Sequence, residues 1–161
     1  MATSSDLRIV DYVPAHHDRF RALNTEWITT YFALEEPDRR ALDEPERHIL
    51  AAGGAILMAE SGGQVVGTVA LLRMAPRVFE LAKMAVAPPA QGRGIGHALG
   101  RAAIERARAL GAARVELLSN TLLAPAIGLY RKLGFVEVPM PPTEYARANI
   151  KMVLELGDTG C

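Results

Sequence analysis

Residues 91–97 (QGRGIGH) have the composition and spacing in this sequence that are best suited to binding chemistry. Gly92, Gly94 and Gly96 alternate with larger residues directly ahead of an Ala-rich helical pattern. The first N–H groups of a helix have no intrahelical partner, and the helix dipole adds positive potential at that end. Because glycines leave room for an anion there and Arg93 adds a charge, the stretch predicts a phosphate-binding loop.

A purely structural role for these glycines stays open on this evidence alone. They would serve equally well to form a tight turn and to let a helix pack closely on a strand. The two best-known phosphate fingerprints do not fit, because G-x-G-x-x-G needs glycine at His97 or Leu99 and the Gly-Lys-Ser/Thr of a P-loop is missing. A protein that uses this loop for ATP or NAD is therefore disfavoured.

Composition limits the class of protein. Half of the 161 residues are hydrophobic, and 18 Lys and Arg balance 18 Asp and Glu. This length suits one domain with a buried core, residues 1–161, and a neutral chain lacks the positive charge of a dedicated nucleic-acid-binding protein. The first residues contain Asp6 and no secretory h-region, and no apolar run reaches the roughly 18 residues of a membrane span. We expect a cytoplasmic protein that binds neither nucleic acid nor membrane.

The sequence gives no reason to expect a metal. The single cysteine, Cys161, is the last residue, so it makes neither a disulfide framework nor a cysteine zinc site. His16, His17, His48 and His97 are scattered at spacings that suggest neither metal ligands nor a nucleophile.

Strands and helices alternate along the chain. Apolar and β-branched runs predict strands at 7–13, 55–60, 64–74, 77–86, 113–119, 135–138 and 149–156. Three- and four-residue spacing predicts helices at 15–33, 94–110 and 125–133, and a more polar helical stretch runs through Leu50. In the 94–110 helix the predicted apolar face is Ile95, Ala98, Leu99, Ala102 and Leu110. The pattern predicts a mixed α/β sheet with helices packed on it.

With these elements around it, QGRGIG at 91–96 fits the Q/R-x-x-G-x-G/A pyrophosphate loop of the GNAT N-acetyltransferase superfamily. An apolar strand precedes the loop and an Ala-rich helix follows it, and LYRKLGF at 129–135 is similar to the family's second motif, a tyrosine-bearing helix that ends at Gly-Phe. The chain resembles this family along nearly its whole length. The resemblance implies a mostly antiparallel sheet with splayed central parallel strands, flanked by helices.

The resemblance also implies that acetyl-CoA is the co-substrate and that no metal is needed. The backbone edge of Met84, Ala85 and Val86 would hold the pantetheine arm, and one of its amides would stabilise negative charge on the thioester oxygen. The pyrophosphate would rest on the loop residues Gln91, Gly92, Arg93, Gly94, Ile95, Gly96 and His97. Many members carry an asparagine seven residues before the tyrosine, where this chain has Leu123, so Asn120 is the candidate to take over part of its task.

Acetyl transfer to an amine needs two proton movements. Tyr130 stands where the family's general acid stands, and a phenol with a pKa of about 10 can protonate a departing thiolate. The alternative for Tyr130 is a core aromatic. Glu80 lies eleven residues before Gln91, which is the spacing of the catalytic glutamate in histone-acetyltransferase members. Glu80 is therefore the candidate base, and the alternatives are a polar residue at a strand rim and a base made of water molecules.

Candidate acceptor contacts come from the segment WITTYFALEEPDRRALDEPE, which is aromatic and rich in carboxylates. Such a lining suits a cationic amine. Trp27, Tyr31 and Glu35 are the candidate substrate-binding residues, and the alternative is a core tryptophan beside a solvated helix face. Lys83 is expected to be a solvated or salt-bridged strand residue, and Tyr145 either packs or closes the site.

The sequence therefore predicts an acetyl-CoA-dependent N-acetyltransferase whose acceptor is a small-molecule or peptide amine. The competing class is an acyl-CoA-binding sensor or partner module that keeps the cofactor site without efficient catalysis, and Tyr130 favours the enzyme. Homodimerisation is common among the proteins that this chain resembles, and a homodimer stays open.

Overall fold

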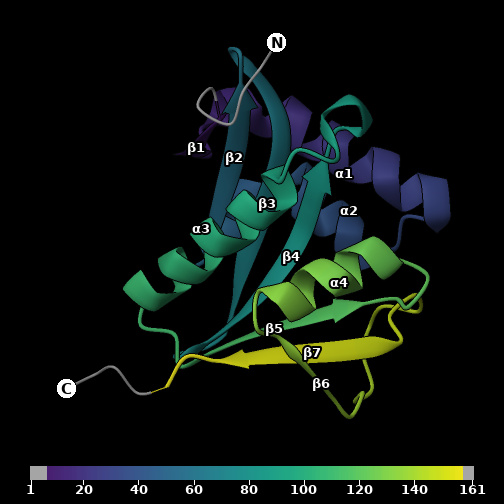
Figure 1. Ribbon diagram of the computed structural model, residues 1–161. Helices are drawn as coiled ribbons and strands as arrows, with labels where there is room; N and C mark the ends of the chain where they lie inside the picture. The colour runs from purple at the N-terminus through teal and green to yellow at the C-terminus, as the bar shows by residue number, and fades with distance from the viewer. Residues whose placement is uncertain (1–6, 158–161) are drawn as a thin grey trace.

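The computed structural model describes residues 7–157 as one seven-stranded sheet with helices on both faces (Figure 1). The strands are β1 (Leu7–Asp11), β2 (Ala55–Ser61), β3 (Gln64–Ala75), β4 (Val78–Val86), β5 (Arg114–Ser119), β6 (Val136–Val138) and β7 (Ile150–Glu155). The helices are α1 (His17–Tyr31), α2 (Glu36–Asp43), α3 (Ile95–Ala109) and α4 (Ala124–Lys132), with short helical turns at Pro14–His16, Glu46–Leu50 and Pro88–Ala90. Asp6 and Cys161 lie outside the described residues.

The strand order is β1-β2-β3-β4-β5-β7-β6, and β4–β5 is the one parallel neighbour pair among these strands. The mostly antiparallel sheet with a central parallel pair is thereby confirmed. The parallel pairing joins only Val78–Glu80 to 114–116, and beyond it the two strands diverge, as Figure 1 shows. This divergence leaves the gap in which the functional site lies.

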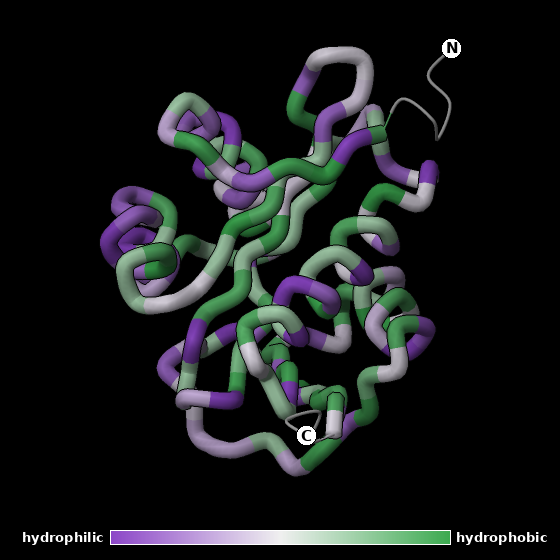
Figure 2. Tube along the Cα trace, turned by 90° about the vertical axis from the view of Figure 1, so that its left-hand side faces the viewer, coloured by the Kyte–Doolittle hydropathy of each residue, from purple (hydrophilic) through white to green (hydrophobic). Residues whose placement is uncertain are grey.

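Two hydrophobic cores hold the helices on the sheet. Along β2, Leu57 and Ala59 belong to the core under α3 and α4, whereas Ile56 and Met58 belong to the core under α1 and α2. Successive strand residues point to opposite faces, so an apolar run such as AILMA buries both. Figure 2 shows the same arrangement as hydrophobic central strands with hydrophilic stretches toward the outside.

The predicted strands and the three predicted amphipathic helices match the structure to within two residues at each end. The predicted polar helical stretch through Leu50 is helical but not continuous, because it is interrupted at Glu44, directly before Pro45, and so divides into α2 and a separate turn at Glu46–Leu50. Proline lacks an amide hydrogen and disfavours helical geometry in the residue before it.

The predicted buried face of α3 is rotated. Ile95 and Leu99 are buried as expected, but the remaining buried positions are Gly100, Ala103, Ile104 and Ala107. Ala98 and Ala102 are half-buried, and Leu110 is exposed just beyond the helix. Rows three and four residues apart are both compatible with the sequence pattern, and packing against the sheet selects between them.

Within residues 7–157, no helix is both long and apolar enough to cross a membrane. The same residues contain no group of three or more His, Cys, Asp and Glu that could hold a metal ion.

Candidate active site

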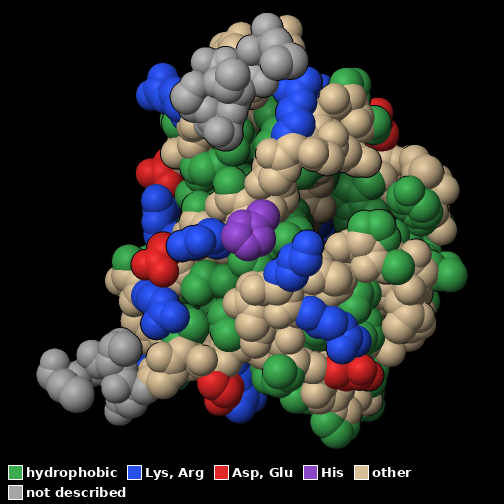
Figure 3. All heavy atoms as spheres, viewed as in Figure 1, with side chains coloured by type: hydrophobic (Ala, Val, Ile, Leu, Met, Phe, Trp, Pro, Cys, Tyr) green, Lys and Arg blue, Asp and Glu red, His purple; other side chains and the backbone are tan. Residues whose placement is uncertain are grey.

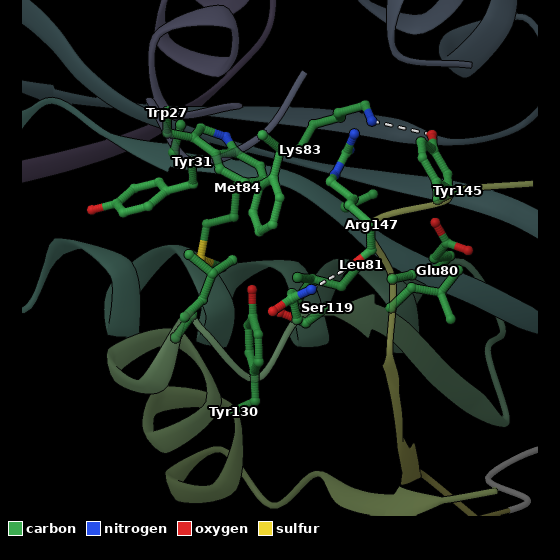
Figure 4. Close-up of a pocket in the computed structure, with 18 of the residues that line it drawn as sticks. Trp27, Tyr31, Glu80, Leu81, Lys83, Met84, Ser119, Tyr130, Tyr145 and Arg147 are labelled. Carbon is green, nitrogen blue, oxygen red and sulfur yellow. Dashed lines mark hydrogen bonds between the residues drawn. The ribbon is translucent and has the colours of Figure 1, made fainter. Parts of the chain in front are cut away.

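A cavity of about 210 Å³ occupies the gap between β4 and β5. Residues 80–86 of β4 form one wall, and residues 118–120 at the end of β5 form another. The helices α1 and α4 contribute Trp27 and Tyr130, and residues 145, 147 and 148 complete the lining. Figure 4 shows that these side chains come from both halves of the sheet.

The wall formed by β4 contains a β-bulge at Lys83. Between the pairs Ala70–Ala82 and Thr68–Ala85, β4 has one more residue than β3. Lys83 has φ 53°, a left-handed conformation that costs a non-glycine residue about 1–2 kcal/mol. Because β5 no longer pairs with β4 here, backbone groups of the bulge and of the residues after it face the cavity.

The loop after β4 ends in a row of unpartnered amides. The N–H groups of residues 92–97 donate to no described residue, and the first helical bond of α3 runs from the Ala98 amide to the Gly94 oxygen at 3.0 Å. Gly92 and Gly94 have φ 82° and 78°, with open space at their Cβ positions. Gly96 differs, since a Cβ there would lie 3.2 Å from Leu129 of α4. Two glycines therefore shape an anion-sized nest, and the third allows close helix packing.

Two further features of this region favour the binding of an anion. Gln91 lines the cavity, and its Nε2 donates to the Val86 oxygen at 3.0 Å, which fixes the start of the loop. Figure 3 shows Lys and Arg side chains on the face that carries α3 and α4. A negatively charged ligand at the N-terminus of α3 would therefore meet amides, the helix dipole and nearby cations.

We expect Gly94→Ala to weaken acetyl-CoA binding by about 5- to 30-fold, because left-handed strain of roughly 1–2 kcal/mol would move the amides out of alignment. Gly111→Ala is the matched control, since Gly111 has φ 89°, open space at Cβ and a place in the turn that follows the far end of α3. Both variants should lose similar stability, and calorimetric titration should show weaker binding only for Gly94→Ala. Equal affinities would contradict a ligand role for the loop.

The position of Tyr130 is compatible with both roles that the sequence left open. Its ring packs edge-on against Phe135, with centroids 6.1 Å apart, as a core aromatic would. Its hydroxyl nevertheless points into the cavity and bonds to no other described residue (Figure 4). Burial raises the pKa of Tyr130 to about 12, so the hydroxyl keeps its proton at neutral pH.

Glu80 lines the same cavity at the last point where β4 pairs with β5. Burial, together with the negative charges of Glu116 and Glu144, raises the pKa of the Glu80 carboxyl to about 7 against the opposing charges of Lys83 and Lys151. Glu80 accepts no hydrogen bond from the described part of the chain. A carboxyl whose pKa lies near neutrality can exchange protons at physiological pH.

A charge cluster of Asp38, Lys83 and Arg147 adjoins the cavity, with Lys83 and Arg147 in its lining and Asp38 behind them. Asp38 is fully buried, and its Oδ1 accepts from the Lys83 Nζ at 2.7 Å. Arg147 meets the same carboxylate with both terminal nitrogens, at 2.6 and 2.7 Å. Lys83 Nζ also donates to the Tyr145 hydroxyl at 3.2 Å. The cluster ties α2, the bulge of β4 and the segment before β7 together.

The structure brings Trp27 and Tyr31 to the cavity but not Glu35. The Glu35 carboxylate instead accepts from the Ala146 amide at 2.8 Å and pairs with Arg147 at 3.3 Å. Glu35 therefore supports the fold here, and its predicted contact with the acceptor stays a prediction without a place in this cavity. Glu35 and Asp38 of this segment both pair with Arg147, and the local sequence does not reveal so distant a partner.

Asn120 lines the cavity, but both ends of its amide are engaged within the protein. Its Nδ2 donates to the Arg147 oxygen at 2.6 Å, and its Oδ1 accepts from the Leu122 amide at 2.8 Å. Asn149 makes a second link between the same turns through Thr121. Asn120 thus holds Arg147 in place, and its contact with a cofactor stays a prediction.

Sequence reasoning missed Asp38 and Arg147 and assigned no role to Lys83. The signal that could have found the cluster is the single basic residue within FELAKMAV, because an unpaired lysine is rarely buried in a central strand. Buried charges require partners, but the partners here lie 45 and 109 residues apart along the chain.

Comparison with known proteins agrees with this geometry. N-acetyltransferase family 8 member 2 of Rattus norvegicus is 37% identical over 114 residues, which make up 68% of this chain and 50% of that protein. The chain thus spans about half the length of this relative.

Solved structures show the same fold. An acetyltransferase of the GNAT family from Staphylococcus aureus Mu50 superposes with a TM-score of 0.85 at 20% identity, covering 93% of this chain and 99% of that one. A phosphinothricin acetyltransferase from Sinorhizobium meliloti, solved in complex with acetyl-CoA, superposes with a TM-score of 0.76 at 20% identity, covering 97% and 92%.

The match to a family model covers most of the residues proposed for the site. The Acetyltransferase (GNAT) family matches residues 19–135, a range that contains Glu80, the β4 bulge, the glycine loop and Tyr130. Together with the splayed parallel strands and the amide nest, this match shows that the chain belongs to the GNAT acetyltransferase family.

Proposed function

We propose that this protein transfers the acetyl group of acetyl-CoA to a primary amine by direct attack of the amine on the thioester. One observation carries the proposal: Glu80 of β4 and Tyr130 of α4 line a single cavity that reaches Val86 and Gln91 at the start of the amide nest. A base, an acid and an anion site are then arranged along one path. The cytoplasmic location stays a prediction from the sequence.

The binding roles follow from the free backbone groups. Residues 92–97 offer amides to the pyrophosphate, and the positive end of α3 adds to their attraction. The edge of Met84, Ala85 and Val86, which has no β5 partner, offers backbone groups to the pantetheine arm. An amide of this edge would stabilise the charge that develops on the acetyl oxygen. Acetyl-CoA itself supplies an activated carbonyl.

The proton balance assigns one task to each side chain. The ammonium of the acceptor gives one proton to the Glu80 carboxylate, which releases it to solvent. As the C–N bond forms and the C–S bond breaks, Tyr130 donates its proton to the departing thiolate. The second proton leaves the nitrogen and restores the Tyr130 hydroxyl. The products are the acetamide and the CoA thiol.

The role of Glu80 predicts how activity depends on pH. Only the ionised carboxylate accepts a proton, so kcat/KM should rise with pH, level off above the pKa near 7 of the free protein, and fall about tenfold per pH unit below it. Glu80→Gln should remove this limb and lower kcat by about 100-fold. Steady-state rates between pH 5 and 9 measure both effects.

Glu116→Gln provides the control for this pH profile. Glu116 lies opposite Glu80 across the β4–β5 pair, and its charge raises the pKa of Glu80. Its removal should move the limb to lower pH and leave the plateau rate in place. If Glu80→Gln keeps the wild-type limb and rate, water molecules rather than Glu80 carry the first proton.

The acyl-CoA sensor remains the competing function, and two measurements separate it from the enzyme. Calorimetric titration with acetyl-CoA, with ATP and NAD as controls, tests the cofactor site. Selective acetyl-CoA binding without thiol release for any amine would support the sensor. Equal binding of all three ligands would leave only a general anion nest.

A homodimer is a further element of the proposal. The strand β6 closes one edge of the sheet, and Val136 on it is exposed, so an edge suited to a second copy exists. Sedimentation equilibrium at the monomer mass alone would contradict it.

A further inference from the structure

The charges that face the cavity are the reverse of those that the sequence suggests. The acidic segment around α2 predicts an anionic lining, yet Asp38 and Glu35 do not line the cavity. The charged residues that line it are Lys83 and Arg147, together with Glu80. Two cations therefore stand between the cavity and their carboxylate partners, and Glu80 contributes the one carboxyl.

Arg147 has an unused hydrogen-bonding edge. Its two terminal nitrogens grip Asp38 end-on, and Nη1 also reaches Glu35 at 3.3 Å. The Nε–H and the second hydrogen of Nη2 bond to no residue in the described part of the chain. These two hydrogens lie on the same side of the planar guanidinium and point in parallel, which is the geometry that a carboxylate accepts in bidentate fashion.

The other residues that line the cavity indicate which further groups a ligand with such a carboxylate would carry. Trp27, Tyr31 and Phe32 line it with aromatic rings, and the Arg147 guanidinium lies 5.8 Å from the Trp27 ring centroid. Glu80 lines it beside Tyr145, as Figure 4 shows. An amine, a carboxylate and an apolar group would thus each meet a suitable partner.

We propose that the acceptor is an α-amino acid with an apolar or aromatic side chain, whose carboxylate binds the free edge of Arg147 while its amine faces Glu80. This inference rests on the proposed function and names its substrate class. Polyamines are poor acceptors in this arrangement, because a second cationic group would meet Lys83 and Arg147.

The test is a series of acceptors on the wild-type protein. L-Phenylalanine, L-phenylalaninamide, 2-phenylethylamine and spermidine are compared by thiol release with acetyl-CoA. We expect kcat/KM for phenylalanine to exceed that of the other three by about 10- to 100-fold, the effect of a bidentate bond to a charged group. The amide has the less basic and thus more available amine, so chemistry alone would favour it over phenylalanine.

Variants test the role of Arg147. Arg147→Lys keeps the charge but loses the fork, so it should raise KM for phenylalanine about tenfold or more and reduce the preference for phenylalanine over the amide by a similar factor. Arg21→Gln is the control, because Arg21 pairs with Asp43 at 2.7 Å on the exposed surface. It should keep the full preference for phenylalanine.

Failure of this inference is distinct from failure of the proposed function. Absence of both acetyl-CoA binding and thiol release would overturn the proposed function and this inference with it. Thiol release with the amide or spermidine equal to or above phenylalanine would overturn the inference alone. If acetyl-CoA binds and no acceptor in the series reacts, calorimetry of phenylalanine with the CoA complex decides, and no binding up to about 10 mM would overturn it.

Discussion

Tyr130→Phe is expected to lower kcat by about 100-fold or more while acetyl-CoA affinity stays unchanged. The substitution removes one oxygen that projects into the cavity and bonds to no described residue, and it keeps the ring that packs on Phe135. Without that proton donor, the thiolate must leave unprotonated or wait for solvent. Steady-state kinetics and calorimetric titration on the same preparation measure the two quantities.

The control for Tyr130→Phe removes a hydroxyl far from the cavity. Tyr12 is buried and donates to Glu46 at 2.5 Å, so Tyr12→Phe should cost stability but keep the wild-type kcat. If Tyr130→Phe turns over within threefold of wild type, the acid assignment is wrong and the hydroxyl is a packing feature.

Asp38→Asn is expected to have the largest effect on stability, lowering the free energy of unfolding by about 3–5 kcal/mol. The substitution leaves the buried Lys83 and the partly buried Arg147 without their shared carboxylate. A typical domain is stable by only 5–15 kcal/mol, so this loss is a large part of the total. Urea unfolding followed by circular dichroism gives the value.

Asp43→Asn is the matched control on the same helix. Asp43 also meets its partner, Arg21, at 2.7 Å, but this pair is about half exposed. Solvent screens such a pair, so its loss should cost between 0 and about 1 kcal/mol. Equal losses for the two variants would show that burial adds nothing to the importance of the Asp38 cluster.

The cluster also predicts acid sensitivity. Burial alone would raise the pKa of Asp38, but the hydrogen bond from Arg147 and the charge and hydrogen bond of Lys83 outweigh it and lower the pKa to about 2. A carboxyl with a lowered pKa stabilises the fold fully above its ordinary value near 4 and loses this contribution as the pH falls toward 2. Wild-type stability should decline over this range, and Asp38→Asn should lack that part of the decline.

Local patterns were sufficient for most of the fold. The strands, the hairpin turn and the loop follow from apolar periodicity and from glycines, which act over a few residues. The buried side of α3 was not decided by these patterns, because Ala98 and Ala103 fit equally well beside Leu99 until the sheet is in place. Pro45 was a local signal that the polar helix prediction passed over.

The candidate site was predictable where resemblance supplied the geometry and unpredictable where distant residues meet. Glu80 and Tyr130 share a cavity, as the resemblance implies, although their chemical roles stay predictions. The sign of the charged side chains that line the acceptor region could not be predicted from the composition of the sequence. The acidic residues around Glu35 are visible in the sequence. Arg147, which pairs with Glu35 outside the cavity, comes more than a hundred residues later in the chain.

The short β4–β5 pairing also bears on how the molecule holds together. Only three residue pairs join one ladder of four strands to another of three, so the sheet is two hydrogen-bonded blocks with a brief seam. A ligand lying along the open part of the seam takes the place of missing strand contacts. Ligand binding would then stabilise the native state by about 2.7 kcal/mol at a concentration of 100 times Kd. The co-substrate would then link the two blocks as an added strand would, and the cooperativity of unfolding should increase when it is bound.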